Sequence, residues 1–149
     1  MKWFITPEST RLSLGEGEWV DVKQRLTHGE REGMLAAMSP LVSPGEPMQL
    51  QRKEIRTALV NTYVVGWSLT RGGVPVRMTP ELPDNERLAT IRSLSAEAFD
   101  LIYAAIDTHV DAMKQADDAE KNGQAGGIGS SATSPSHEPA TGDTSGSVN

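Results

Sequence analysis

The composition of the chain changes abruptly after Glu120, and this change limits how much of it can fold. Beyond that residue the only large aliphatic side chains are Ile128 and Val148, among many Gly, Ser, Thr, Ala and Pro residues. Such a segment cannot bury enough apolar surface to offset the entropy lost on ordering it. We therefore expect one compact domain over residues 1–120 and a disordered polar tail over residues 121–149, which limited proteolysis should remove first.

Length, charge and cysteine content exclude several classes of function. The chain has 149 residues, enough for one domain, and a formal net charge of −6. A negative net charge repels the phosphate groups of nucleic acids and of anionic membranes, which are bound by clustered Lys and Arg. We therefore expect no nucleic-acid partner and no membrane partner. Cysteine is absent, which excludes disulfides and zinc ribbons and suits a reducing cytoplasm. Residues 1–7 lack the apolar core of a signal peptide, and Leu59–Leu69, the longest apolar stretch, is too short for a bilayer.

Two alternating segments around a glycine turn predict a β-hairpin. Polar and apolar residues alternate over Arg11–Leu14 and in part over Glu18–Lys23, and the intervening Gly-Glu-Gly has the conformational freedom of a hairpin loop. One face of the hairpin should carry its apolar residues, Leu12, Leu14, Val20 and Val22. Trp19 and Asp21 should lie on the other face. The segment Trp3–Ile5 is a candidate third strand.

A capping box predicts the first helix. The Thr27 hydroxyl can accept from the Glu30 backbone N–H, while the Glu30 carboxylate accepts from the Thr27 N–H. One side of this helix should hold its apolar residues, Met34, Leu35 and Met38. The helix should stop before Pro40 and lead into a loop at Ser43–Pro47.

A second helix is predicted from Gln49 to Trp67. Apolar residues recur there every four positions, at Ile55, Leu59, Tyr63 and Trp67. The alternative is a strand over Leu59–Trp67, because Val, Thr and Tyr favour sheets, but the helix formers before it favour the helix. A turn should follow at Arg71–Pro75, and Thr79-Pro80-Glu81 carries the residues that open a short helix.

The clearest helical pattern begins after Ser95. Ser95 is a suitable N-cap, and Leu94 before it can pack against Phe99. A period of about 3.6 residues then places the apolar residues on one face: Phe99, Ile102, Tyr103, Ile106, Val110 and Met113. We expect burial of Phe99, Ile102, Ile106 and Val110, and solvent exposure of Asp100, Asp107, Asp111 and Lys114.

The polar residues form no recognisable catalytic or metal-binding pattern. The three histidines, His109 among them, are widely spaced and are interpreted as incidental polar residues. Glu18 and Asp21 belong to an acidic hairpin that we expect to be solvated. The basic residues of the segment 52–56 are interpreted as a solvated helix face. We therefore predict that the protein is not an enzyme and needs neither a cofactor nor a metal.

Trp19 is the residue most open to interpretation. A large ring on the outer face of a hairpin either packs under a neighbouring helix or contacts a partner. The first alternative is the more common one and is also expected for Trp67. As an interface residue, Trp19 would supply affinity while Glu18 and Asp21 steer the encounter, so these three are the candidate partner-binding residues.

Three segments resemble small tail assembly chaperones and related tail-module proteins of siphophages. The first runs from Leu12 to Glu30, with an acidic Gly-Glu-Gly turn, a Trp-containing strand and then Leu-Thr-x-Gly-Glu. The second, Tyr63–Val76, has a Trp-Ser pair before a glycine turn and a Pro-Val stretch, although Gly66 stands where relatives carry an acidic or polar residue. The third consists of Leu94-Ser95 and then Ile102 to His109. Together they cover about residues 10–112.

The resemblance implies a non-enzymatic bacteriophage protein that acts in the host cell cytoplasm. It would be a chaperone or scaffold that keeps the tail tube or tape-measure protein competent for viral tail assembly. The alternative is a structural virion component, such as a head-tail connector or tail-completion protein. The predicted fold class is α+β: an N-terminal β-hairpin, with a third strand in one alternative, packed on three or four helices and followed by the disordered tail.

Overall fold

The computed structural model describes residues 3–38 and 48–125. Residues 1–116 form one compact unit and residues 117–149 a second, of which the structure describes only 117–125. The loop predicted at Ser43–Pro47 lies outside the described residues. So does the predicted tail, apart from its first five residues, which are helical.

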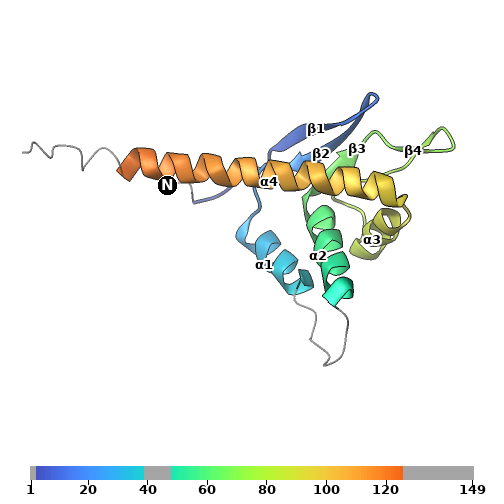
Figure 1. The fold of residues 1–149 in the computed structure, drawn as a ribbon, viewed down its shortest axis with the longest axis horizontal. Helices are drawn as coiled ribbons and strands as arrows, with labels where there is room; N and C mark the ends of the chain where they lie inside the picture. The colour runs from blue at the N-terminus through green and yellow to red at the C-terminus, as the bar shows by residue number, and fades with distance from the viewer. Residues whose placement is uncertain (1–2, 39–47, 126–149) are drawn as a thin grey trace, which may run out of the picture. The chain divides into compact units, whose positions relative to one another are not determined.

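The first unit is an α+β domain with a three-stranded antiparallel sheet (Figure 1). Its strands are β1 (Ser9–Gly15), β2 (Glu18–Lys23) and β3 (Val64–Trp67), in the order β1-β2-β3. The predicted hairpin and fold class are confirmed. In the hairpin turn Gly15 and Gly17 have φ values of 91° and 82°, a region that favours glycine.

The two faces of the hairpin are those predicted. Leu12 pairs with Val20, and Val20 and Val22 are fully buried. On the opposite face Arg11 pairs with Asp21, and Ser13 pairs with Trp19. The alternation of burial along β1 follows from the two-residue period of a strand.

The third strand was predicted in the wrong place. Trp3–Ile5 forms no strand, and the side chains of Trp3 and Phe4 are 83% and 89% exposed. Instead, α2 (Met48–Tyr63) ends four residues before the predicted helix end, and β3 follows it directly. The strand alternative was therefore correct for Val64–Trp67, because pairing with β2 outweighs the helical spacing of the apolar residues.

The remaining helices follow their local signals in part. α1 (His28–Met38) begins at the capping box and lies beside α2 (Figure 1). On its apolar side Met34 packs against the core, whereas Leu35 is 48% exposed. α3 (Asp84–Arg92) begins after Pro83. The short helix predicted from Thr79 is wrong: a turn occupies that position, with the Leu82 N–H donating to the Thr79 carbonyl at 3.3 Å.

The glycine turn and the last helix lie where the sequence places them. β4 (Thr70–Arg71) and β5 (Val74–Pro75) form a small hairpin around the predicted turn. α4 (Ala96–Ala125) is capped by Ser95, whose Oγ accepts from the Ala98 N–H at 3.2 Å. None of the helices in the described ranges combines the length and apolar character needed to cross a membrane.

The core lies between the sheet and the helices α2, α3 and α4. It consists of Val20, Val22, Val60, Tyr63, Val64, Trp67, Met78, Ile91, Ile102 and Ile106. Ile102 and Ile106 are fully buried as predicted, whereas Phe99 and Val110 are only partly buried. Trp67 is a core residue, and its indole N–H donates to the Val76 carbonyl at 2.8 Å. The four charged residues predicted to face solvent on α4 are exposed.

Candidate partner-binding surface

The outer face of the hairpin carries a cluster of three side chains, Arg11, Trp19 and Asp21, which we call the outer-face cluster. Arg11 Nε lies 2.8 Å from Asp21 Oδ1, and Arg11 Nη2 lies 3.0 Å from Asp21 Oδ2. The same guanidinium lies over the Trp19 ring, with 3.5 Å between Arg11 Cζ and the ring centroid. One guanidinium therefore makes a two-point ion pair and a cation–π contact at once.

Trp19 lies outside the core of the protein. Its side chain is half-buried, and it does not belong to the buried cluster. The expectation that Trp19 packs beneath its own helices is therefore wrong, because β2 directs it away from them. The hydrogen bond from Arg11 to Asp21 raises the pKa of Arg11, so the guanidinium stays charged over the ring.

Glu18 occupies a different environment from the two residues with which it was grouped. The Ser68 hydroxyl donates to a Glu18 carboxylate oxygen. Ser68 Oγ also accepts from the Trp19 backbone N–H at 2.8 Å, and the Ser68 N–H donates to the Trp19 carbonyl at 3.1 Å. These bonds join β2 to Ser68, the residue that follows β3. The outer-face cluster therefore contains Arg11 in the place where Glu18 was expected. The position of Arg11, opposite Asp21 in the hairpin, was the sequence signal for its contact with Asp21.

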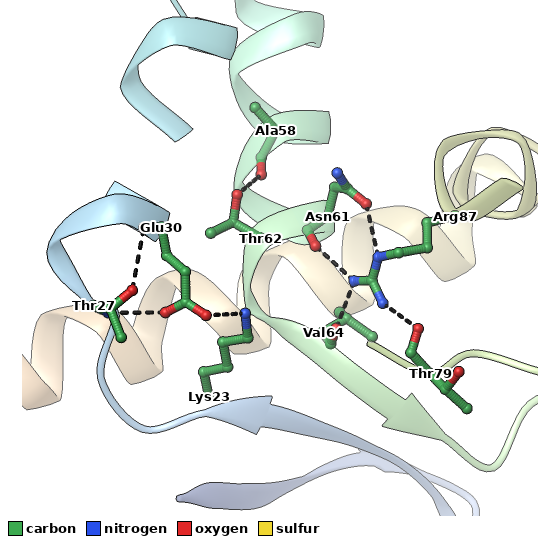
Figure 2. Close-up of polar contacts among 9 residues, drawn as sticks. All are labelled: Lys23, Thr27, Glu30, Ala58, Asn61, Thr62, Val64, Thr79 and Arg87. Atoms are coloured by element: carbon green, nitrogen blue, oxygen red, sulfur yellow. Dashed lines mark hydrogen bonds and ion pairs between the residues drawn. The ribbon is translucent and has the colours of Figure 1, made fainter. Parts of the chain in front are cut away.

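A second polar network joins the end of β2 to the start of α1 (Figure 2). The Thr27 N–H donates to Glu30 Oε2 at 2.8 Å, and the Glu30 N–H donates to Thr27 Oγ1 at 3.2 Å, which confirms the capping box. Lys23 Nζ donates to Glu30 Oε1 at 2.6 Å. Burial alone would raise the pKa of Glu30, but the hydrogen bonds from Lys23 and Thr27 outweigh it and lower that pKa.

Arg87 is a buried arginine that the sequence did not single out. Its side chain is 7% exposed. The guanidinium donates to the carbonyls of Asn61, Val64 and Thr79 at 2.7, 2.7 and 2.8 Å and to Asn61 Oδ1 at 3.2 Å (Figure 2). Burial lowers the pKa of Arg87, with Asp84 nearby acting in the opposite direction. Arg87 therefore ties α3 to the end of α2 and to the loop at Thr79.

Two hollows adjoin these networks. One, of about 210 Å³, is lined by Lys23, Val64, Pro80, Leu82, Asp84 and Arg87. The other, of about 370 Å³, is lined by the apolar residues Ile5, Pro7, Val65 and Pro80 and by six polar residues, among them Lys23, Arg25, Glu8 and Glu30. Lys23 and Pro80 line both hollows. In the parts of the chain that the structure describes, no group of three or more His, Asp or Glu side chains is arranged to hold a metal ion.

Two residues interpreted as incidental or solvated have structural contacts. His109 is only 8% exposed; its Nε2 lies 3.1 Å from the Lys23 carbonyl oxygen, and its ring meets Tyr63 edge-on. Arg56 pairs with Asp100 and lies over the rings of Phe99 and Tyr103. The basic segment is thus a solvated face only in part, because Arg56 joins α2 to α4.

Comparisons with known proteins identify no relative. No protein-family model matches the chain, and neither a curated protein nor a solved structure is significantly similar to it.

Proposed function

We propose that this protein is a non-enzymatic chaperone of siphophage tail assembly. It would act in the host cytoplasm and bind the tail tube or tape-measure protein before assembly. The residue patterns from Leu12 to Glu30, from Tyr63 to Val76 and from Leu94 to His109 support this proposal, because they resemble that family. In this fold the first segment spans most of β1, all of β2 and the start of α1, the second spans β3 to β5, and the third spans the first part of α4.

The outer-face cluster is the observation that carries the proposal. Tryptophan and arginine are, with tyrosine, the side chains enriched among the residues that dominate binding energy at interfaces. Here both are held in place before any partner arrives, because Asp21 fixes the guanidinium and the guanidinium covers the ring. An ordered anchor loses less side-chain entropy on binding than a mobile one. A partner can therefore dock on this face at little ordering cost.

The neighbouring charges favour a protein partner over a nucleic acid. Arg11 is neutralised by Asp21, and the chain as a whole carries a net charge of −6. The cluster thus offers an aromatic surface with one compensated cation, unlike the uncompensated Lys and Arg that bind phosphates.

The proposal is tested by co-expressing the chain with the tail tube or tape-measure protein of the same phage. Trp19→Ala should weaken capture of the partner by about 2 kcal/mol, roughly 30-fold. Leu101→Ala, which removes an apolar residue that is also exposed but lies on α4, is the matched control and should bind normally. Equal binding by Trp19→Ala and the wild type would refute the role of this face.

The composition of purified virions separates the chaperone from the structural alternative. A chaperone should be absent from mature particles or present only in traces, because it acts before the tail is complete. Mass spectrometry that finds the chain at stoichiometric levels would overturn the chaperone proposal and favour a connector or tail-completion protein.

A further inference from the structure

The segment before β1 exposes two adjacent aromatic side chains. Trp3 and Phe4 are 83% and 89% exposed, while the next residue, Ile5, is 38% exposed. We call Trp3–Ile5 the aromatic arm. Exposed tryptophan and phenylalanine in a row cost free energy in water, and contiguous exposed apolar surface commonly marks an interaction site.

The larger hollow lies at the root of this arm. Ile5 and Pro7 form part of its wall, with Val65 of β3 and Pro80. Its volume of about 370 Å³ is in the range of pockets that accept small ligands, so it has room for an aromatic ring. The exposure of Trp3 and Phe4 means that the arm does not fill the hollow of its own chain.

We propose that the protein forms a symmetric dimer in which the aromatic arm of each copy occupies the larger hollow of the other. The arm tip is two residues from Ile5, a span of at most about 7 Å. Because the arm root lines the hollow, a two-fold axis beside the root brings each tip to the partner's hollow. Such an interface uses the same patch on both copies, as two-fold dimers require.

The charges around the hollow suit contact with a second copy. Glu8 and Glu30 lie among its lining residues together with Lys23 and Arg25, so the two signs balance. A patch of a single sign would repel its symmetric copy, whereas a balanced patch can pair with itself. This balance favours a second copy of the chain over a strongly charged partner.

The area that the arms can bury is sufficient for a dimer. A buried Trp or Phe side chain covers about 150–250 Å². With one ring of each arm in the partner's hollow and the other packed against its rim, the four rings and the surface that they cover would bury roughly 1,200–2,000 Å², the size of a standard protein interface.

Sedimentation velocity of the full chain over a range of concentrations tests the dimer. The wild type should dimerise, and Trp3→Ser combined with Phe4→Ser should weaken dimerisation at least about 30-fold. Pro80→Glu, which places a charge in the hollow at an exposed turn, should do the same. Val74→Ser, which removes an exposed apolar residue from the β4–β5 hairpin, is the control and should leave dimerisation unchanged.

Mixing the two defective proteins tests the exchange itself. The arm variant keeps an intact hollow and Pro80→Glu keeps an intact arm, so the mixture should form a heterodimer with one arm in place. Recovery of dimer in the mixture supports the proposal, and its absence overturns the exchange. A wild type that stays monomeric, or an arm variant that dimerises normally, overturns the dimer. Circular dichroism of each variant confirms that the core, which excludes these positions, is intact.

Discussion

Replacing Arg87 with methionine tests whether the buried guanidinium holds α2, α3 and the Thr79 loop together. Methionine keeps most of the apolar stem but donates no hydrogen bond. The Val64 carbonyl, whose bond to Arg87 is buried, would lose its partner at a cost of about 1–3 kcal/mol. The other three bonds are partly buried, and each contributes about 0.5–1.5 kcal/mol.

Two effects reduce that total. Water can enter the smaller hollow, which Arg87 lines, and removing the guanidinium also removes the cost of burying its charge. We therefore expect Arg87→Met to lower the free energy of unfolding by about 3–4 kcal/mol. Arg87→Lys should recover only part of the loss, because an ammonium cannot match the planar fork that reaches three carbonyls.

Urea unfolding followed by circular dichroism measures these differences. Arg92→Met, at an exposed position in the last turn of the same helix, is the matched control and should cost less than about 1 kcal/mol. If Arg87→Met cost no more than this control, the four hydrogen bonds would contribute nothing net. The account of Arg87 as the connection between α2 and α3 would then be refuted.

Three further predictions concern the core, the β2–β3 connection and the capping box. Ile106→Ala should cost about 2–5 kcal/mol in unfolding free energy, and a cost within about 0.5 kcal/mol would show that the α4 face is misassigned. Ser68→Ala should cost about 1–2 kcal/mol by leaving the Trp19 N–H without its acceptor; unchanged urea unfolding would contradict this. The pKa of Glu30 is lowered from its ordinary value of 4.5, so its contacts stabilise the fold fully above that value and are lost as pH falls through the lowered pKa. The stability advantage of the wild type over Glu30→Gln should therefore shrink below about pH 4.5 in acid titrations, and an advantage that grew on acidification would disprove the assignment.

The features predicted correctly from the sequence are those that local interactions determine. The β1–β2 hairpin follows from alternation around Gly15 and Gly17, and the start of α1 follows from Thr27 and Glu30. The buried face of α4 follows from the helical period. In each case the residues that decide the structure lie within a few positions of one another.

The features predicted wrongly depend on distant residues. Val64–Trp67 continues the helical spacing of α2, and only pairing with β2 makes it a strand. The carbonyls that bind Arg87 belong to residues up to 26 positions away, so no local pattern indicates its burial. The contacts of Arg11 with Trp19 and Asp21 depend on the register of the hairpin, which brings Arg11 opposite Asp21 although the two lie ten positions apart in the sequence.

The direct passage from α2 into β3 has a consequence for how the chain folds. Val22 and Val64 pair in the sheet, yet the segment between them contains both α1 and α2. The β1–β2 hairpin can close within a few residues, whereas docking of β3 must close this long loop and lose its entropy first. We therefore expect β3 docking to limit the folding rate. A nascent chain that had emerged only as far as α2 would expose Val20 and Val22 to water until β3 and α4 arrived to cover them.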